Sequence, residues 1–128
     1  GLSHVFFEGF QPPRDYYARA SALILTSEYE GFPLVITECM SFGVVPVVYG
    51  SYPAVYDIIE DGKDGMILPK TDAGFDARAM AGKLEQLMQD SERLETMARA
   101  AIVKSSDWSV DRIYEQWMGV INGLEWKK

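Results

Sequence analysis

Two glutamates that lie eight residues apart, Glu30 and Glu38, have the type and spacing to bind one polar ligand. A carboxylate can accept hydrogen bonds from two neighbouring hydroxyl groups at once, and such charge-assisted bonds are stronger than neutral ones. In a helix that begins at Pro33, the backbone of Glu38 is roughly 7–8 Å along the axis, which suits a ribose next to a phosphate. Glu30 precedes this helix, so we expect it to face another part of the ligand, for which a hexosyl group is the natural candidate.

The five residues from Gly31 to Val35 (Gly31, Phe32, Pro33, Leu34 and Val35) form a turn suited to an anion or a sugar hydroxyl. Gly31 allows a close approach of the backbone, and Pro33 is expected at the first helical position, where its missing N–H costs no hydrogen bond. The N–H groups of Leu34 and Val35 are then predicted to be free. With the positive end of the helix dipole behind them, they can hold a phosphate without a lysine.

The elements that must position this turn alternate along the first half of the chain. Short apolar runs predict strands at 5–7, 22–26, 44–49 and 66–68, with helices at 14–20 and 33–42 and a short one through 57–59. Three apolar stripes at helical spacing follow, the last through Ile113, Trp117, Ile121 and Leu124. We therefore expect an α/β fold with a partial Rossmann-like parallel sheet of about four strands, flanking helices and a C-terminal helical segment. Its β/α part is residues 1–69 and its helical part residues 70–128, and ligands of such sheets bind at the carboxyl ends of the strands.

Composition narrows the range of partners. Twelve basic and nineteen acidic residues give a net charge of −7, which repels nucleic acid. One cysteine and one histidine are too few for a protein zinc site, so we expect no metal and no cofactor. The N-terminal residues do not have the pattern of a signal peptide, so the expected location is the cytoplasm, or the inner membrane face for a longer enzyme.

The string EGFPLVITECMSFGVVPVV resembles the E-x7-E signature of the family 4 retaining glycosyltransferases, which have the GT-B fold. The segment IIEDGKDGMIL also resembles the turn that follows in this family, and the similarity covers roughly residues 4 to 120. It implies the C-terminal, nucleotide-sugar-binding domain of such an enzyme, truncated on its N-terminal side. Pro53-Ala54 stands where many relatives have Gly-Gly, a departure that affects the loop on the acceptor side.

The resemblance also implies roles for residues. Glu30 corresponds to the catalytic glutamate that contacts the donor sugar, and Glu38 to the one that holds the ribose, with the backbone from Gly31 to Val35 cradling the sugar and diphosphate. Gly9 and Phe10 fall where the family lines the nucleobase pocket. The implied reaction transfers a hexosyl group from a UDP- or GDP-hexose to a glycan or lipid-linked acceptor, with no essential metal.

Two alternatives remain open at this point, namely a related GT-B sugar-nucleotide enzyme of the epimerase kind and a non-catalytic α/β module. The resemblance also implies that two central strands, the diphosphate-gripping Arg and Lys and the acceptor domain are missing, so the isolated chain should be inactive. The strand at 22–26 would then have a bare edge. We expect either that residues 5–7 dock beside it or that the chain forms a homodimer through exposed strand edges.

Overall fold

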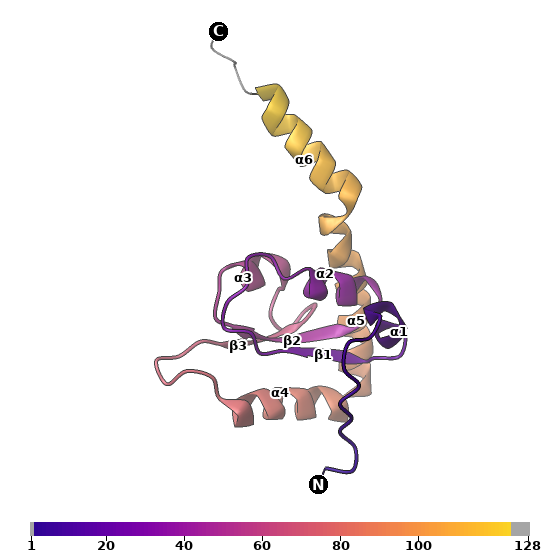
Figure 1. Cartoon of the computed structure of the whole chain (residues 1–128), viewed down its shortest axis with the longest axis vertical. Helices are drawn as coiled ribbons and strands as arrows, with labels where there is room; N and C mark the ends of the chain where they lie inside the picture. The colour runs from indigo at the N-terminus through magenta and orange to yellow at the C-terminus, as the bar shows by residue number, and fades with distance from the viewer. Residues whose placement is uncertain (1, 124–128) are drawn as a thin grey trace.

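The computed structural model describes residues 2–123 as an α/β body with one helix extending from it (Figure 1). The elements follow one another as α1 (Pro13–Tyr17), β1 (Ala22–Leu25), α2 (Leu34–Ser41), β2 (Val45–Gly50), α3 (Ala54–Ile58), β3 (Met66–Pro69), α4 (Ala77–Gln89), α5 (Ser91–Ser105), a 3-10 turn η1 (Ser106–Trp108) and α6 (Val110–Gly123). This alternation confirms the α/β class and the flanking helices expected from the sequence.

The sheet has three parallel strands in the order β1-β2-β3. All six residues of β2 are buried, as expected of a central strand covered on both faces. The register pairs Leu25 with Val48 and Tyr49 with Leu68, so the three strands end at one edge. The loops that follow β1 and β2 therefore meet at the edge where ligands of parallel sheets bind.

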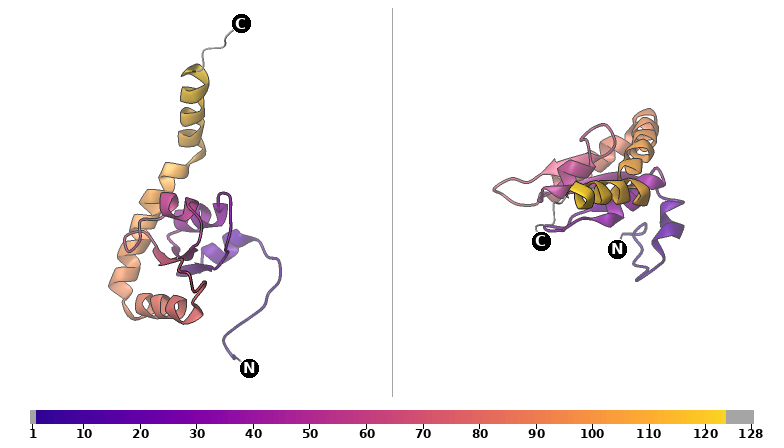
Figure 2. Two further views of the ribbon diagram at one scale, coloured as in Figure 1. Left: turned by 90° about the vertical axis from the view of Figure 1, so that its left-hand side faces the viewer. Right: turned by 90° about the horizontal axis from the view of Figure 1, so that it is seen from above.

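The strand predicted at residues 5–7 does not form. This segment has no regular secondary structure, and Phe6 and Phe7 are 76% and 98% exposed. Figure 2 shows that this segment extends away from the α/β body. The prediction that it docks beside β1 is therefore also wrong. Three apolar residues are too short a run for periodicity to identify a strand, and a strand without a pairing partner gains no ladder hydrogen bonds. The sheet accordingly has three strands rather than about four.

Two apolar layers cover the two faces of the sheet. One joins α2 and α3 to the sheet through residues that include Ile36, Val48 and Ile58, and the other joins α4 through Val47 and Met80. Helix α5 contributes to both layers and runs along one side of the body, as Figure 1 shows. Helix α2 packs against both the sheet and α5. The loop that leads into the N-terminus of α2 is therefore anchored at that end.

The C-terminal helices have well-defined starts. Asp76 caps α4 by accepting hydrogen bonds from the N–H groups of Arg78 and Ala79, and Asp90 caps α5 by accepting one from Arg93. Helix α6 instead leaves the body and buries none of its described residues (Figures 1 and 2). In its predicted apolar stripe, Ile113 is partly buried and Trp117 and Ile121 are exposed, while Leu124 lies outside the described residues.

Within residues 2–123, no helix is both long and apolar enough to cross a lipid bilayer.

Candidate functional site

The motif loop, residues 27–33, leaves β1 at the edge where the strands end, and β2 holds it in place. The Ser51 hydroxyl, directly after β2, donates a hydrogen bond to the carbonyl oxygen of Glu28 at 2.7 Å and lies 3.1 Å from that of Ser27. These contacts bind the start of the loop to the end of the neighbouring strand. The sequence placed the loop at this edge, but it did not indicate the contact with Ser51.

The turn that starts α2 differs from the prediction by one residue. Pro33 is the N-cap, with φ −78° and ψ 83°, and the helix begins at Leu34. The N–H of Leu34 is not free, because it donates to the carbonyl oxygen of Phe32 at 3.0 Å. Within residues 2–123 the Val35 N–H has no hydrogen-bond acceptor, so one of the two expected donors remains available to a ligand. Gly31 and the side chains of Phe32 and Leu34 are exposed, whereas Pro33 is buried and Val35 is partly buried, so one side of the turn is open to solvent.

Glu30 lies in this loop next to a buried tyrosine that follows β2. Its side chain is partly buried, while Tyr52 is only 3% exposed. The pKa of Tyr52 is raised above its ordinary value, first by burial and second by the negative charge of Glu30. The Tyr52 hydroxyl therefore stays protonated at neutral pH and can act as a hydrogen-bond donor.

Glu38 lies one turn along α2 on an exposed position, near a second buried tyrosine. The pKa of Tyr17 is raised by burial first and then by the negative charge of Glu38. Tyr17 also packs against Phe42, with ring centroids 5.7 Å apart. Each of the two motif glutamates is thus next to a tyrosine of the same apolar layer, one from α1 and one from the loop after β2.

Phe32, at the centre of the turn, packs on the C-terminal part of the chain. Its ring lies 5.0 Å from the ring of Trp108, centroid to centroid, at a tilt of 54°. Trp108 belongs to η1 and packs against the layer that contains α2. The packing of Trp108 therefore connects the motif turn to the point where α6 departs.

The residues expected to line the nucleobase pocket lie apart from these contacts. Gly9 has a positive φ of 66°, which favours glycine, and the Phe10 side chain is 100% exposed. Both belong to the irregular segment before α1. Their role in base binding stays a prediction.

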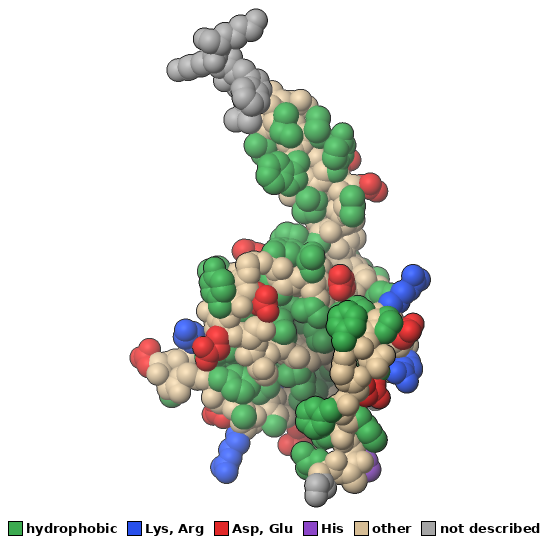
Figure 3. All heavy atoms as spheres, viewed as in Figure 1, with side chains coloured by type: hydrophobic (Ala, Val, Ile, Leu, Met, Phe, Trp, Pro, Cys, Tyr) green, Lys and Arg blue, Asp and Glu red, His purple; other side chains and the backbone are tan. Residues whose placement is uncertain are grey.

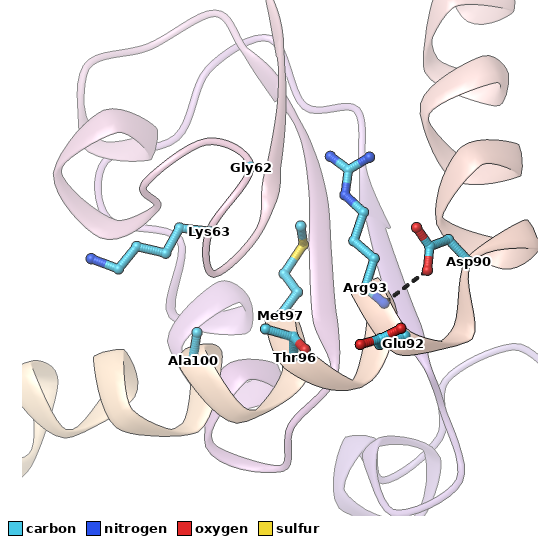
Figure 4. Close-up of a pocket in the computed structure, with 8 residues that line it drawn as sticks. All are labelled: Gly62, Lys63, Asp90, Glu92, Arg93, Thr96, Met97 and Ala100. Atoms are coloured by element: carbon cyan, nitrogen blue, oxygen red, sulfur yellow. Dashed lines mark hydrogen bonds between the residues drawn. The ribbon is translucent and has the colours of Figure 1, made fainter.

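The structure also contains a cavity of about 540 Å³ that the motif does not line. Figure 4 shows it between the turn at Gly62-Lys63 and the first half of α5, with Asp90, Glu92 and Arg93 among its residues. Its two cations are offset by two carboxylates, and the Lys63 ammonium points away from Arg93 toward its ion pair with Glu60. The residues that line this cavity therefore carry no excess of positive charge that would attract an anion. In the described part of the chain, no group of three or more His, Cys, Asp or Glu side chains is placed to hold a metal ion.

Comparison with known proteins places the chain in a family. The family described as "Glycosyl transferases group 1" matches residues 1–104, which include β1, the whole motif and β3. The chain belongs to the group 1 glycosyl transferases. The resemblance to a glycosyltransferase family that the sequence indicates is thereby confirmed.

Curated relatives of this group 1 chain come from several bacteria. An "Uncharacterized glycosyltransferase" of Haemophilus influenzae is 28% identical over 106 residues, which cover 83% of this chain and 29% of the relative. An alpha-1,4-N-acetyl-D-galactosaminyltransferase of Campylobacter jejuni, whose name includes an undecaprenol-linked substrate, is 30% identical over 94% of this chain and 33% of the relative. The chain thus spans about a third of the length of these relatives.

Solved structures support the fold. A chain of the GtfA/B complex superposes with a TM-score of 0.78 at 20% identity, over 90% of this chain and 23% of that one. The C-terminal domain of the glycosyl transferase LpcC from Francisella tularensis superposes with a TM-score of 0.64 at 21% identity, over 83% and 52%. The expected GT-B type of α/β fold is therefore confirmed.

Reasoning from the sequence missed the two tyrosines and Ser51 as parts of this site. Tyr17 and Tyr52 are both buried, and each is separated in sequence from the glutamate beside it. A pattern of residue types within one motif cannot reveal such contacts. The only available signal was topological, because Ser51 and Tyr52 directly follow the strand next to β1.

Proposed function

We propose that this chain is the donor-binding part of a retaining glycosyltransferase that transfers a hexosyl group from a UDP- or GDP-hexose to a glycan or lipid-linked acceptor. The observation that carries the proposal is the open turn at residues 31–35, which stands between Glu30 and Glu38 at the edge where β1 and β2 end. The Val35 N–H offers a donor to a phosphate or hydroxyl. The group 1 family and its biosynthetic relatives support the same reaction class.

In this proposal the two glutamates have different tasks. Glu38 is exposed on the helix and accepts hydrogen bonds from the ribose hydroxyls, while the partly buried Glu30 contacts the hexosyl group. The backbone of residues 31–35 lies between them and holds the diphosphate and sugar. Gly9 and Phe10 supply the nucleobase contact, and catalysis also requires groups that hold the acceptor next to the donor.

A comparison of nucleotide sugars with free nucleotides tests these separate tasks of Glu30 and Glu38. The dissociation constants of UDP-glucose, GDP-mannose, UDP and GDP would be measured with the chain and with E30Q and E38Q. We expect E38Q to weaken nucleotide and nucleotide sugar alike, because both contain the ribose. E30Q should weaken only the nucleotide sugars, by about tenfold, the effect of losing one charge-assisted contact.

A control variant guards against general effects of charge. Glu85 lies on α4 with an exposed side chain and no part in the motif, so E85Q should bind all four ligands as the parent does. If the parent binds none of them, or if E30Q and E38Q bind like E85Q, the proposal fails and the non-catalytic α/β module is favoured instead.

A further inference from the structure

Two buried polar side-chain atoms have no hydrogen-bond partner within residues 2–123, and both are beside the motif loop. They are the hydroxyl of Tyr52 and the indole N–H of Trp108. Most buried polar groups in native proteins are paired, so an exception needs a reason. Trp108 packs on Phe32 of the motif turn, and Tyr52 lies near Glu30. Both unpaired groups therefore lie where the apolar layer of α2 meets the motif loop.

The position of Tyr52 follows from the sheet. Its chain neighbour Ser51 bonds to the carbonyl oxygens at the start of the motif loop, so the two loops are held together. Tyr52 is 3% exposed and packs in the layer with α2 and α3. Its ring is therefore fixed, whereas Glu30 is on an irregular loop and has no hydrogen bond or ion pair within the described residues.

We infer that Tyr52 is a positioning residue for Glu30, whose carboxylate accepts a hydrogen bond from the buried Tyr52 hydroxyl when the hexosyl donor is bound. This inference rests on the proposed function. The rigid phenol fixes one carboxylate oxygen and leaves the other for the sugar. The unpaired hydroxyl costs stability in the free protein and gains its partner only in the complex, as is common for functional groups.

The variant Y52F tests the inference, because it removes the hydroxyl and keeps the ring. A purely structural role of the hydroxyl predicts a lower Tm in Y52F. The positioning role predicts an unchanged or higher Tm, together with weaker binding of UDP-glucose or GDP-mannose by about tenfold and unchanged binding of UDP or GDP. In the E30Q background, Y52F should have no further effect on donor binding.

Tyr56 provides the matched control. It is four residues away, half exposed, and its hydroxyl donates a hydrogen bond to the carbonyl oxygen of Gly50 at 3.1 Å. The variant Y56F should therefore lose stability and keep its affinity for the donors, the opposite of Y52F. Both variants would be compared by thermal unfolding and by titration with UDP-glucose, GDP-mannose and the free nucleotides.

The outcomes separate the two claims. If Y52F binds the nucleotide sugars like the parent while E30Q does not, the inference about Tyr52 is overturned and the proposed function stands. The inference is also overturned if Y52F loses stability as Y56F does. If E30Q itself leaves nucleotide-sugar affinity unchanged, the role of Glu30 in the proposed function fails, and the role of Tyr52 fails with it.

Discussion

Asp64 is a charged residue whose side chain is buried by the fold, at 2% exposure. It accepts a hydrogen bond from the N–H of Glu60 at 2.8 Å and so closes the turn that leads into β3. Burial is the main cause that raises the pKa of this carboxyl above its ordinary value, and the nearby Lys104 offsets part of that effect. The folded protein therefore binds a proton at Asp64 more tightly than the unfolded chain does.

This difference gives a pH-dependent prediction. A raised pKa in the folded state means that Asp64 stabilises the fold most below its unfolded pKa of about 3.9 and that this contribution is lost as the pH rises. Asparagine keeps the acceptor oxygen and does not titrate. The free energy of unfolding of D64N, measured relative to the parent in urea at pH 3.5, 5 and 7, should thus improve with rising pH. A relative decline of D64N over the same range would contradict the assigned shift.

At the scale of single residues, the sequence predicted only site residues that belong to one continuous motif. Glu30, Glu38 and the turn between them follow from residue type, and the structure places them at the expected edge of the sheet. The burial of Tyr52 and its proximity to Glu30 depend on the pairing of β1 with β2, which residue types alone do not specify. The prediction of a free Leu34 N–H was wrong, because this group donates a hydrogen bond to the Phe32 carbonyl oxygen in a tight turn before the helix. The first residue of a helix is uncertain by about one or two positions when it is predicted from sequence.

At the scale of elements, the contact between the end of β2 and the motif loop sets the geometry of the site. The variant S51A removes the hydroxyl that holds Ser27 and Glu28 and should lower the free energy of unfolding by about 0.5–1.5 kcal/mol. Hydrogen exchange at residues 28–32 should accelerate as the loop loosens. Ser105 bonds only within its own helix, so S105A is the control and should leave exchange in the loop unchanged.

The packing of Phe32 on Trp108 gives a second test between elements. The variant F32A should lower the free energy of unfolding by at least about 0.5–1.5 kcal/mol, the contribution of an aromatic pair beyond its buried area. Tyr29 in the same loop is 84% exposed, so Y29A should have little effect. Equal urea midpoints for F32A and Y29A would show that the pair does not hold the turn.

The sequence predicted the elements well where hydrophobic periodicity and flanking glycine or proline agree, as in α2 and β2. The prediction of a strand at residues 5–7 was wrong, since an apolar run forms a strand only when a neighbouring strand offers hydrogen bonds. For α6 the predicted apolar stripe is present, and Trp117 and Ile121 on it are exposed. Periodicity identifies an apolar face, but it does not say what covers that face.

Exposed apolar side chains within residues 2–123 lie on the segment before α1, where Phe7 is 98% exposed, and on α6, where Trp117 is 63% exposed and Figure 3 shows hydrophobic side chains gathered. The outer edge of β1 also has no strand partner within these residues. A bare strand edge favours pairing with another chain. We therefore propose, from the sheet edge rather than the helix, that the chain forms a homodimer through β1.

Light scattering of two lysine variants distinguishes these surfaces. Ile24 is 47% exposed on β1, and a lysine on an edge strand opposes pairing. I24K should be monomeric at concentrations where the parent is dimeric, and W117K should remain dimeric. If W117K is monomeric and I24K is not, association runs through α6 instead.

The central claim is that the turn at residues 31–35 and its two flanking glutamates form a nucleotide-sugar site. Its most direct test is a titration of the isotopically labelled chain with UDP-glucose and with GDP-mannose, monitored by the backbone amide resonances. We predict saturable shifts that concentrate at residues 30–38 and at Tyr52. The claim would be contradicted if the shifts concentrate around Gly62 and Arg93, which line the other cavity, or if neither donor shifts the amide resonances of residues 30–38.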